Sequence, residues 1–147
     1  MITRRQVEDL LRRIGDQADD EIDLAEAGLA LAALEQPPAT LTPYHQHLET
    51  LAGEVAARAA ALPDTLDNRA EALVGVLVDH YGYQGDTETY DDPCNANLMQ
   101  VIERRRGLPV ALGMSISVGP MAFESVTAEG GCATWFFSVA RRSSARR

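Results

Sequence analysis

Lysine is absent from this chain of 147 residues, so all 13 of its basic residues are arginine. Aromatic residues make up only 5% of the sequence, whereas hydrophobic residues make up 46%. A core with so few large rings has to be filled by Ala, Leu and Val, and this composition suits closely packed helices. The exclusive use of Arg together with abundant Ala also suggests a GC-rich genome.

Cysteine is nearly absent as well, with single residues at Cys94 and Cys132. Two cysteines are too few for a disulfide framework in a chain of this size, and no paired spacing suggests a metal site. No apolar run reaches the roughly 18 residues of a membrane span, and the N-terminus has no apolar signal region. We therefore expect no membrane association, no metal, no cofactor and a cytoplasmic location.

Positive charge is in short supply: the net charge is −9 and the pI is about 4.7. A general nucleic-acid binder needs a basic face to displace counterions, so nucleic acid is not an expected partner. Acidity of this kind usually serves solubility. A protein partner of unidentified kind remains the expectation.

The apolar periodicity predicts a mostly α fold of five helices. Thr3 is expected to cap the first helix, and Thr42 the third, with Pro43 in its first turn. Asn95 or Asp92 is expected to start the fifth helix, and Gly107 to end it. The predicted ranges are 3–15, 20–35, 43–62, 66–81 and 95–106.

A polar loop over residues 82–93 separates the last two predicted helices. It carries several carboxylates, whereas the fifth helix ends in Arg104, Arg105 and Arg106. These charges are opposite in sign and close in sequence, and arginines also suit a helix C-terminus. We predict that at least one of the three arginines pairs with a carboxylate of residues 86–92.

The character of the sequence changes after Gly113. Residues 1–106 contain 20 Asp or Glu and 9 Arg, whereas residues 114–147 contain 2 Asp or Glu and 4 Arg. Helical periodicity fades at the same place. We therefore divide the chain into a helical domain, residues 1–113, and an atypical tail, residues 114–147.

Three segments in order resemble the SirB-one family of transglutaminase-like proteins, over residues from about 20 to 113. The first two are 22–37 and 66–85. The third is the most specific and resembles the family pattern Y-x-D-P-x-N-S-x-L-x-x-V-L-x-R-R-x-G-I-P-I-S-L. Its matching residues here are Tyr90, Asp92, Pro93, Asn95, Leu98, Val101, Arg104, Arg105, Gly107, Pro109 and Leu112.

The resemblance implies a helical N-terminal portion of a transglutaminase-like α+β domain, with its C-terminal part incomplete. The superfamily's nucleophile stands in a G-x-C pattern, and aligning Gly107 with that glycine puts Pro109 in the cysteine's place. The family's histidine falls beyond the point where the likeness stops. On this alignment the chain lacks two of the three catalytic groups.

The likeness ends abruptly near Gly113. A shifted reading frame, starting at the third base of the Met114 codon, permits a sequence like the family's missing helix. A single-base insertion or deletion cuts a motif at one point, whereas drift erodes it gradually. We therefore interpret residues 114–147 as a candidate frameshifted tail.

Cys94 is the remaining candidate nucleophile, because it follows Pro93 at an expected helix start, where the helix dipole lowers a thiol's pKa. His80, before the same loop, is its candidate base. We favour the interpretation that Cys94 is a partly buried cysteine without a catalytic role, because it occupies a variable position of the motif.

Two other groups offer weaker candidates for a metal. His45 and His47 are two residues apart on a helix and therefore point in opposite directions, as surface or boundary histidines do. The acidic residues 86–92 lack the spacing of an EF-hand loop.

Three functions follow from the sequence. The first is a non-catalytic transglutaminase-like protein with a regulatory or scaffolding role, as a truncated or frameshifted remnant of the family. The second is a cysteine-dependent hydrolase or acyltransferase that uses Cys94. The third is a small acidic helical interaction domain unrelated to transglutaminases.

Overall fold

The computed structural model describes residues 1–36 and 39–107. Its α-helices are α1 (Arg4–Gly15), α2 (Leu24–Glu35), α3 (Thr42–Ala60), α4 (Leu66–Val74) and α5 (Leu98–Arg104). Short 3-10 turns cover Asp19–Glu21 and Pro93–Asn95, and a π-helix, Gly75–His80, continues α4. The two-residue strands β1 (Gln84–Gly85) and β2 (Arg106–Gly107) pair in parallel. The mostly α fold is thus as predicted.

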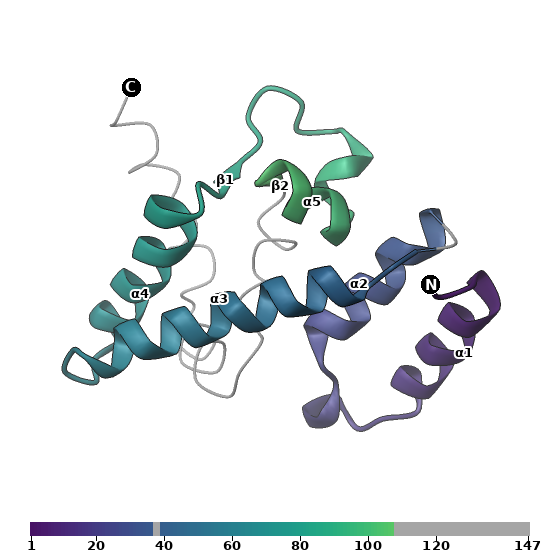
Figure 1. The fold of residues 1–147 in the computed structure, drawn as a ribbon, viewed down its shortest axis with the longest axis horizontal. Helices are drawn as coiled ribbons and strands as arrows, with labels where there is room; N and C mark the ends of the chain where they lie inside the picture. The colour runs from purple at the N-terminus through teal and green to yellow at the C-terminus, as the bar shows by residue number, and fades with distance from the viewer. Residues whose placement is uncertain (37–38, 108–147) are drawn as a thin grey trace.

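Helix α3 runs across the middle of the molecule (Figure 1). The pair α1 and α2 lies at one end of α3, α4 packs at the other, and α5 lies against α2. Side chains from all five described α-helices meet in the core, with Leu73 contributed by α4. The largest fully buried apolar ones are Val7, Leu29, Leu48, Leu51, Leu98 and Val101.

Short polar side chains cap four of the five described α-helices, all except α3. Thr3 caps α1, as predicted, and forms a capping box with Gln6. Asp23 caps α2, whose first residue is Leu24, so the predicted start at residue 20 is corrected. Residues 19–21 form only a 3-10 turn, because the Asp23 carboxylate accepts the first α2 backbone N–H groups.

Helix α3 begins one residue earlier than predicted. Thr42 is its first residue rather than its cap, and Leu41, which caps the helix without a side-chain hydrogen bond, precedes it. Pro43 lies in the first turn, where a missing backbone N–H carries no penalty. The Thr42 prediction was wrong because Thr and Pro at the first two positions fit inside the helix equally well.

The predicted fourth helix, residues 66–81, changes its hydrogen bonding in the middle. After Val74 the backbone widens into the π-helix Gly75–His80, and the Tyr81 N–H donates to Val76 O at 3.0 Å. The Arg58 guanidinium lies against Gly75, where an added Cβ would sit 2.4 Å from Arg58 Cζ. Such widened turns often mark functional positions.

The fifth helix starts later and ends earlier than predicted. Asn97 caps α5, whereas Asp92 caps the preceding 3-10 turn and Asn95 ends that turn. The helix stops at Arg104, because Arg105 adopts the left-handed conformation with φ of 55°. Gly107 is therefore not the stop but the second residue of β2.

The β1–β2 pair brings the loop of residues 82–93 onto the end of α5. Gln84 N–H donates to Arg105 O at 3.0 Å, and Gln84 and Gly85 are in register with Arg106 and Gly107. This pairing lies above α3 in Figure 1. The acidic loop and the three arginines consequently lie on the same side of α3. Residues 108–147, and with them Pro109 and the expected tail, lie outside the described residues.

Candidate functional site

The loop after β1 folds around a buried carboxylate, that of Asp86, a residue only 3% exposed. It accepts hydrogen bonds from Glu88 N at 3.0 Å, Thr89 N at 2.9 Å and Thr89 Oγ1 at 2.6 Å. Hydrogen bonds to the charged form, led by that of the Thr89 hydroxyl, hold the pKa of Asp86 well below its usual range. Asp86 is therefore an ionised anchor for the loop.

Asn95 completes the same loop from the inside. Its side chain is fully buried and its Nδ2 donates to Thr89 O at 2.6 Å and Tyr90 O at 3.3 Å. Its Oδ1 accepts from Arg104 Nη1 at 3.4 Å. Asp86, Thr89, Asn95 and Arg104 together form what we call the Asp86 network.

Two of the three consecutive arginines pair with this loop, as predicted. Arg104 Nη2 lies 3.3 Å from Asp86 Oδ2, and Arg106 Nη1 lies 3.5 Å from Glu88 Oε2. The Asp86 carboxylate is fully buried, whereas Glu88 is largely exposed. Motif residues Asp92, Asn95 and Arg104 therefore hold the loop in shape.

Cys94 sits in the 3-10 turn that Pro93 begins. Its N–H donates to Asp92 Oδ1 at 2.8 Å, a contact that lowers the pKa of Asp92. Hydrogen bonding of the Cys94 thiol to the same carboxylate, followed by burial, raises the thiol's pKa. This direction is opposite to the one expected from a helix start and favours the protonated thiol.

His80 lies at the end of the π-helix, exposed, with its ring edge-on to Tyr81 at 4.8 Å between centroids. Within residues 1–36 and 39–107, no hydrogen bond joins Cys94 to a histidine. The structure thus does not assemble the candidate Cys94–His80 pair.

The third arginine of the run, Arg105, turns to a different set of side chains. Its Nη1 contacts His47 Nε2 on α3 and donates to Tyr83 Oη at 2.6 Å. Its guanidinium lies over the Tyr83 ring at 4.8 Å and near the Tyr81 ring at 5.5 Å from the centroids. We call His47, Tyr81, Tyr83 and Arg105 the Arg105 cluster.

The cluster is internally satisfied around the imidazole. Arginine can only donate, so His47 Nε2 is an acceptor and the ring proton is on Nδ1. Tyr83 Oη lies 2.9 Å from the same nitrogen. Burial, and then the positive charge of Arg105, lower the pKa of His47, whereas the charge of Glu54 opposes them. His47 is therefore a neutral imidazole in this structure.

Sequence reasoning did not find this cluster. His47 was interpreted as a boundary histidine, and half-burial on α3 agrees with that. Its contact with Arg105 joins residues 58 positions apart, and no local pattern encodes such a separation. The tyrosines on both sides of Gly82 were the available signal, because an arginine commonly lies over the face of a tyrosine ring.

Gly107, a motif residue, has a packing role in β2. A Cβ added there would lie 2.4 Å from Val101 Cγ2, 2.9 Å from Val101 Cγ1 and 3.1 Å from Asn95 O. Only glycine fits between α5 and the 3-10 turn at this point.

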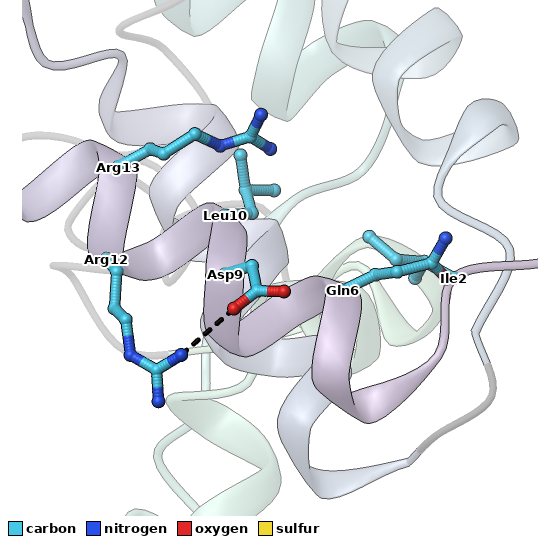
Figure 2. A pocket seen from close by; sticks show the side chains of 6 residues that line it. All are labelled: Ile2, Gln6, Asp9, Leu10, Arg12 and Arg13. Atoms are coloured by element: carbon cyan, nitrogen blue, oxygen red, sulfur yellow. Dashed lines mark hydrogen bonds and ion pairs between the residues drawn. The ribbon is translucent and has the colours of Figure 1, made fainter.

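A separate open hollow of about 590 Å³ lies along α1 (Figure 2). The labelled side chains come from Ile2 and from α1, and the Arg12 guanidinium in it is already paired with Asp9 at 2.9 Å. It contains none of the motif residues.

In the described part of the chain no group of three or more His, Cys, Asp or Glu side chains is placed to hold a metal. No helix among these residues is both long and apolar enough to cross a membrane.

A family model described as the transglutaminase-like superfamily matches residues 42–116, which include both the Asp86 network and the Arg105 cluster. This chain belongs to the transglutaminase-like superfamily. It is also 36% identical over 100 residues to a UPF0162 protein of Vibrio cholerae serotype O1. The matched part is 67% of this chain and 36% of that relative, so the chain corresponds to little more than a third of it. No solved structure matches.

Proposed function

We propose that this chain is a non-catalytic member of the transglutaminase-like superfamily with a regulatory or scaffolding role, which acts by binding a protein partner. The observation that carries the proposal is the state of Cys94. A cysteine nucleophile needs a lowered pKa and a base within hydrogen-bond reach. Here the Asp92 carboxylate raises the pKa of the thiol, and His80 packs on Tyr81 instead.

The arrangement around the motif supports a structural use of its polar residues. Asp92, Asn95 and Arg104 each make contacts that shape the loop, and Gly107 allows β2 to pack closely. These contacts hold the loop in one shape on the side of α3 that carries the β1–β2 pair. A loop that is already held in one shape suits a binding module, because little conformational entropy is lost on association.

Alkylation of Cys94 tests the proposal. In a Cys132→Ser background, which leaves one thiol, the rate of iodoacetamide labelling should rise with pH through a midpoint above that of a free cysteine. Asp92→Asn should move the midpoint to lower pH, because it removes the negative charge beside the thiol. Asp91→Asn, at the neighbouring exposed carboxylate, is the matched control and should leave the midpoint in place.

The rival function is a cysteine-dependent hydrolase or acyltransferase, and membership of the superfamily is the observation in its favour. It requires burst labelling of Cys94 by an acyl-type probe at neutral pH, with loss of the burst in His80→Ala. That pair of results would replace the non-catalytic proposal. The third hypothesis, a domain unrelated to transglutaminases, is ruled out by the family match.

We further propose that the chain belongs to the SirB-one branch and is cytoplasmic. We also propose that it is a truncated or frameshifted remnant of the family. The basis of the remnant proposal is the abrupt loss of likeness near Gly113, together with the charge change after it. The coding DNA around the Gly113 codon tests it. A shifted frame that restores the family pattern supports a remnant, and a frame without that pattern contradicts it.

A further inference from the structure

We propose that the Arg105 cluster is a binding site for a carboxylate group, of the kind an acidic side chain of a protein partner presents. This inference rests on the proposed binding role and names the chemistry of the group that is bound. It starts from a difference among three neighbouring arginines. Arg104 and Arg106 each pair with a carboxylate, whereas Arg105 has none within 4.0 Å among the described residues.

The guanidinium of Arg105 has donors to spare. Of its five N–H groups, the two on Nη1 are directed at His47 Nε2 and Tyr83 Oη. The remaining three, on Nε and Nη2, have no hydrogen-bond partner in the part of the chain described here. Nε and Nη2 form the edge of the guanidinium that binds a carboxylate with two parallel hydrogen bonds.

The position of that edge is fixed in advance. Tyr83 and Tyr81 hold the guanidinium by cation–π contact, and Tyr83 itself is only 3% exposed. The backbone of Arg105 is in the left-handed region, with φ of 55°, which costs energy in a residue other than glycine. A cation held in one geometry loses little entropy when it binds a planar anion.

The electrostatic surroundings of the cluster favour binding through direct contact with Arg105 over long-range attraction. The chain as a whole is acidic, with a net charge of −9, so it does not attract anions from a distance. Glu54, a carboxylate that acts electrostatically on His47, accepts a hydrogen bond from Tyr81 Oη at 2.8 Å. At physiological ionic strength charges beyond about 8 Å are largely screened, so the short-range fork of Arg105 decides binding.

An NMR titration of the full chain tests the site. Sodium acetate is added at constant ionic strength against sodium chloride, and the Arg105 Nε–Hε and His47 ring resonances are followed. We expect a saturable shift with acetate alone. Arg105→Gln should abolish the His47 shift, and Arg105→Lys should weaken binding, because an ammonium group lacks the planar fork. Arg106→Gln, the matched control, should retain it.

Several results would overturn the proposal. Shifts that are linear in acetate and equal in chloride exclude a site, as does a His47 shift that persists in Arg105→Gln. Tighter saturation by inorganic phosphate than by acetate at the same resonances excludes carboxylate as the preferred ligand class. If Arg105→Gln does not fold, the wild-type titration alone still decides. Acetate binding and Cys94 labelling are independent readouts, so failure of the site is distinguishable from failure of the non-catalytic role.

Discussion

Arg104 and Arg105 are adjacent in the chain, yet they serve two regions with different chemistry. Arg104 completes the Asp86 network, in which a buried carboxylate and a buried amide have partners from the loop itself. Arg105 joins the Arg105 cluster, where a cation is held by aromatic rings and a neutral imidazole. The left-handed backbone at Arg105 separates them, because it ends the helix that would otherwise continue through both residues.

The difference indicates which region is structural and which, under the proposal above, binds a ligand. In the Asp86 network the charges are neutralised internally. Disrupting this network should therefore lower the free energy of unfolding. In the Arg105 cluster the cation has unused donors. Removing this cation should therefore mainly weaken the binding of a ligand. Changes to the first region should therefore destabilise the fold more than changes to the second.

The largest expected effect comes from Asn95→Ala, within the Asp86 network. It removes the donor to Thr89 O and Tyr90 O and the acceptor for Arg104 from a fully buried position. Leaving buried polar groups without partners should lower the free energy of unfolding by about 2–3 kcal/mol. Urea denaturation at neutral pH measures this. A loss below about 0.5 kcal/mol would show that the network does not hold the loop.

Gly107→Ala should follow, because the added methyl group collides with both Val101 Cγ atoms and approaches Asn95 O. Overpacking of this kind should cost about 1–3 kcal/mol of unfolding free energy. Gly53→Ala is the matched control: its Cβ meets nothing within 4 Å, and it lies inside α3. The control should be stabilised by about 0.5–1 kcal/mol. Equal effects of both variants would contradict the packing role of Gly107.

The contrast between the two regions also explains which contacts could be predicted from the sequence. The pairing of Arg104 and Arg106 with the acidic loop was predictable in kind, because the opposite charges lie only 18 residues apart, although the β1–β2 pair is what brings them together. The cap of α1 at Thr3 was predictable because it depends on residues only three apart. Local patterns encode local contacts.

The other features depend on contacts that no local pattern contains. The β1–β2 pair has two residues per strand, too short for an alternating pattern. Asp92 and Asn95 were the predicted caps, but Asn97, which was not a candidate, starts α5, and only the fold decides this. The π-helix at Gly75–His80 has the apolar spacing of an ordinary helix. The contact of His47 with Arg105 requires α3 and the end of α5 to be placed first.

The next prediction separates hydrogen bonding from charge pairing at Asp86. Thr89→Val removes the hydroxyl that contributes most to the lowered pKa of Asp86, so that pKa should rise. A lowered folded-state pKa gives stability that is present above the unfolded value, near 3.8, and lost as the pH falls through the folded value. The variant should therefore lose less stability on acidification over this range, and a carboxyl-carbon NMR titration measures the shift. An unchanged Asp86 pKa would assign the effect to other groups.

The smallest expected effect concerns His47, in the Arg105 cluster. Burial and the charge of Arg105 lower its pKa from the ordinary value of 6.5, with Glu54 acting in the opposite direction and Tyr81 and Tyr83 as the other titratable neighbours. The unfolded chain then binds the proton more readily than the folded chain. Stability contributed by neutral His47 is present above pH 6.5 and is lost as the pH falls below it toward the folded pKa.

This pH range lies above that of Asp86, so the two regions can be measured in one protein. Comparing urea midpoints at pH 7.5 and pH 5.5 should show a modest loss at the lower pH in the wild type. His47→Gln keeps an acceptor for Arg105 but has no proton to gain, so part of that loss should disappear. His45→Gln, two residues away on α3, is the control and should retain the full loss. If His47→Gln keeps it as well, another group titrates there, and Arg105 is not coupled to the protonation of His47.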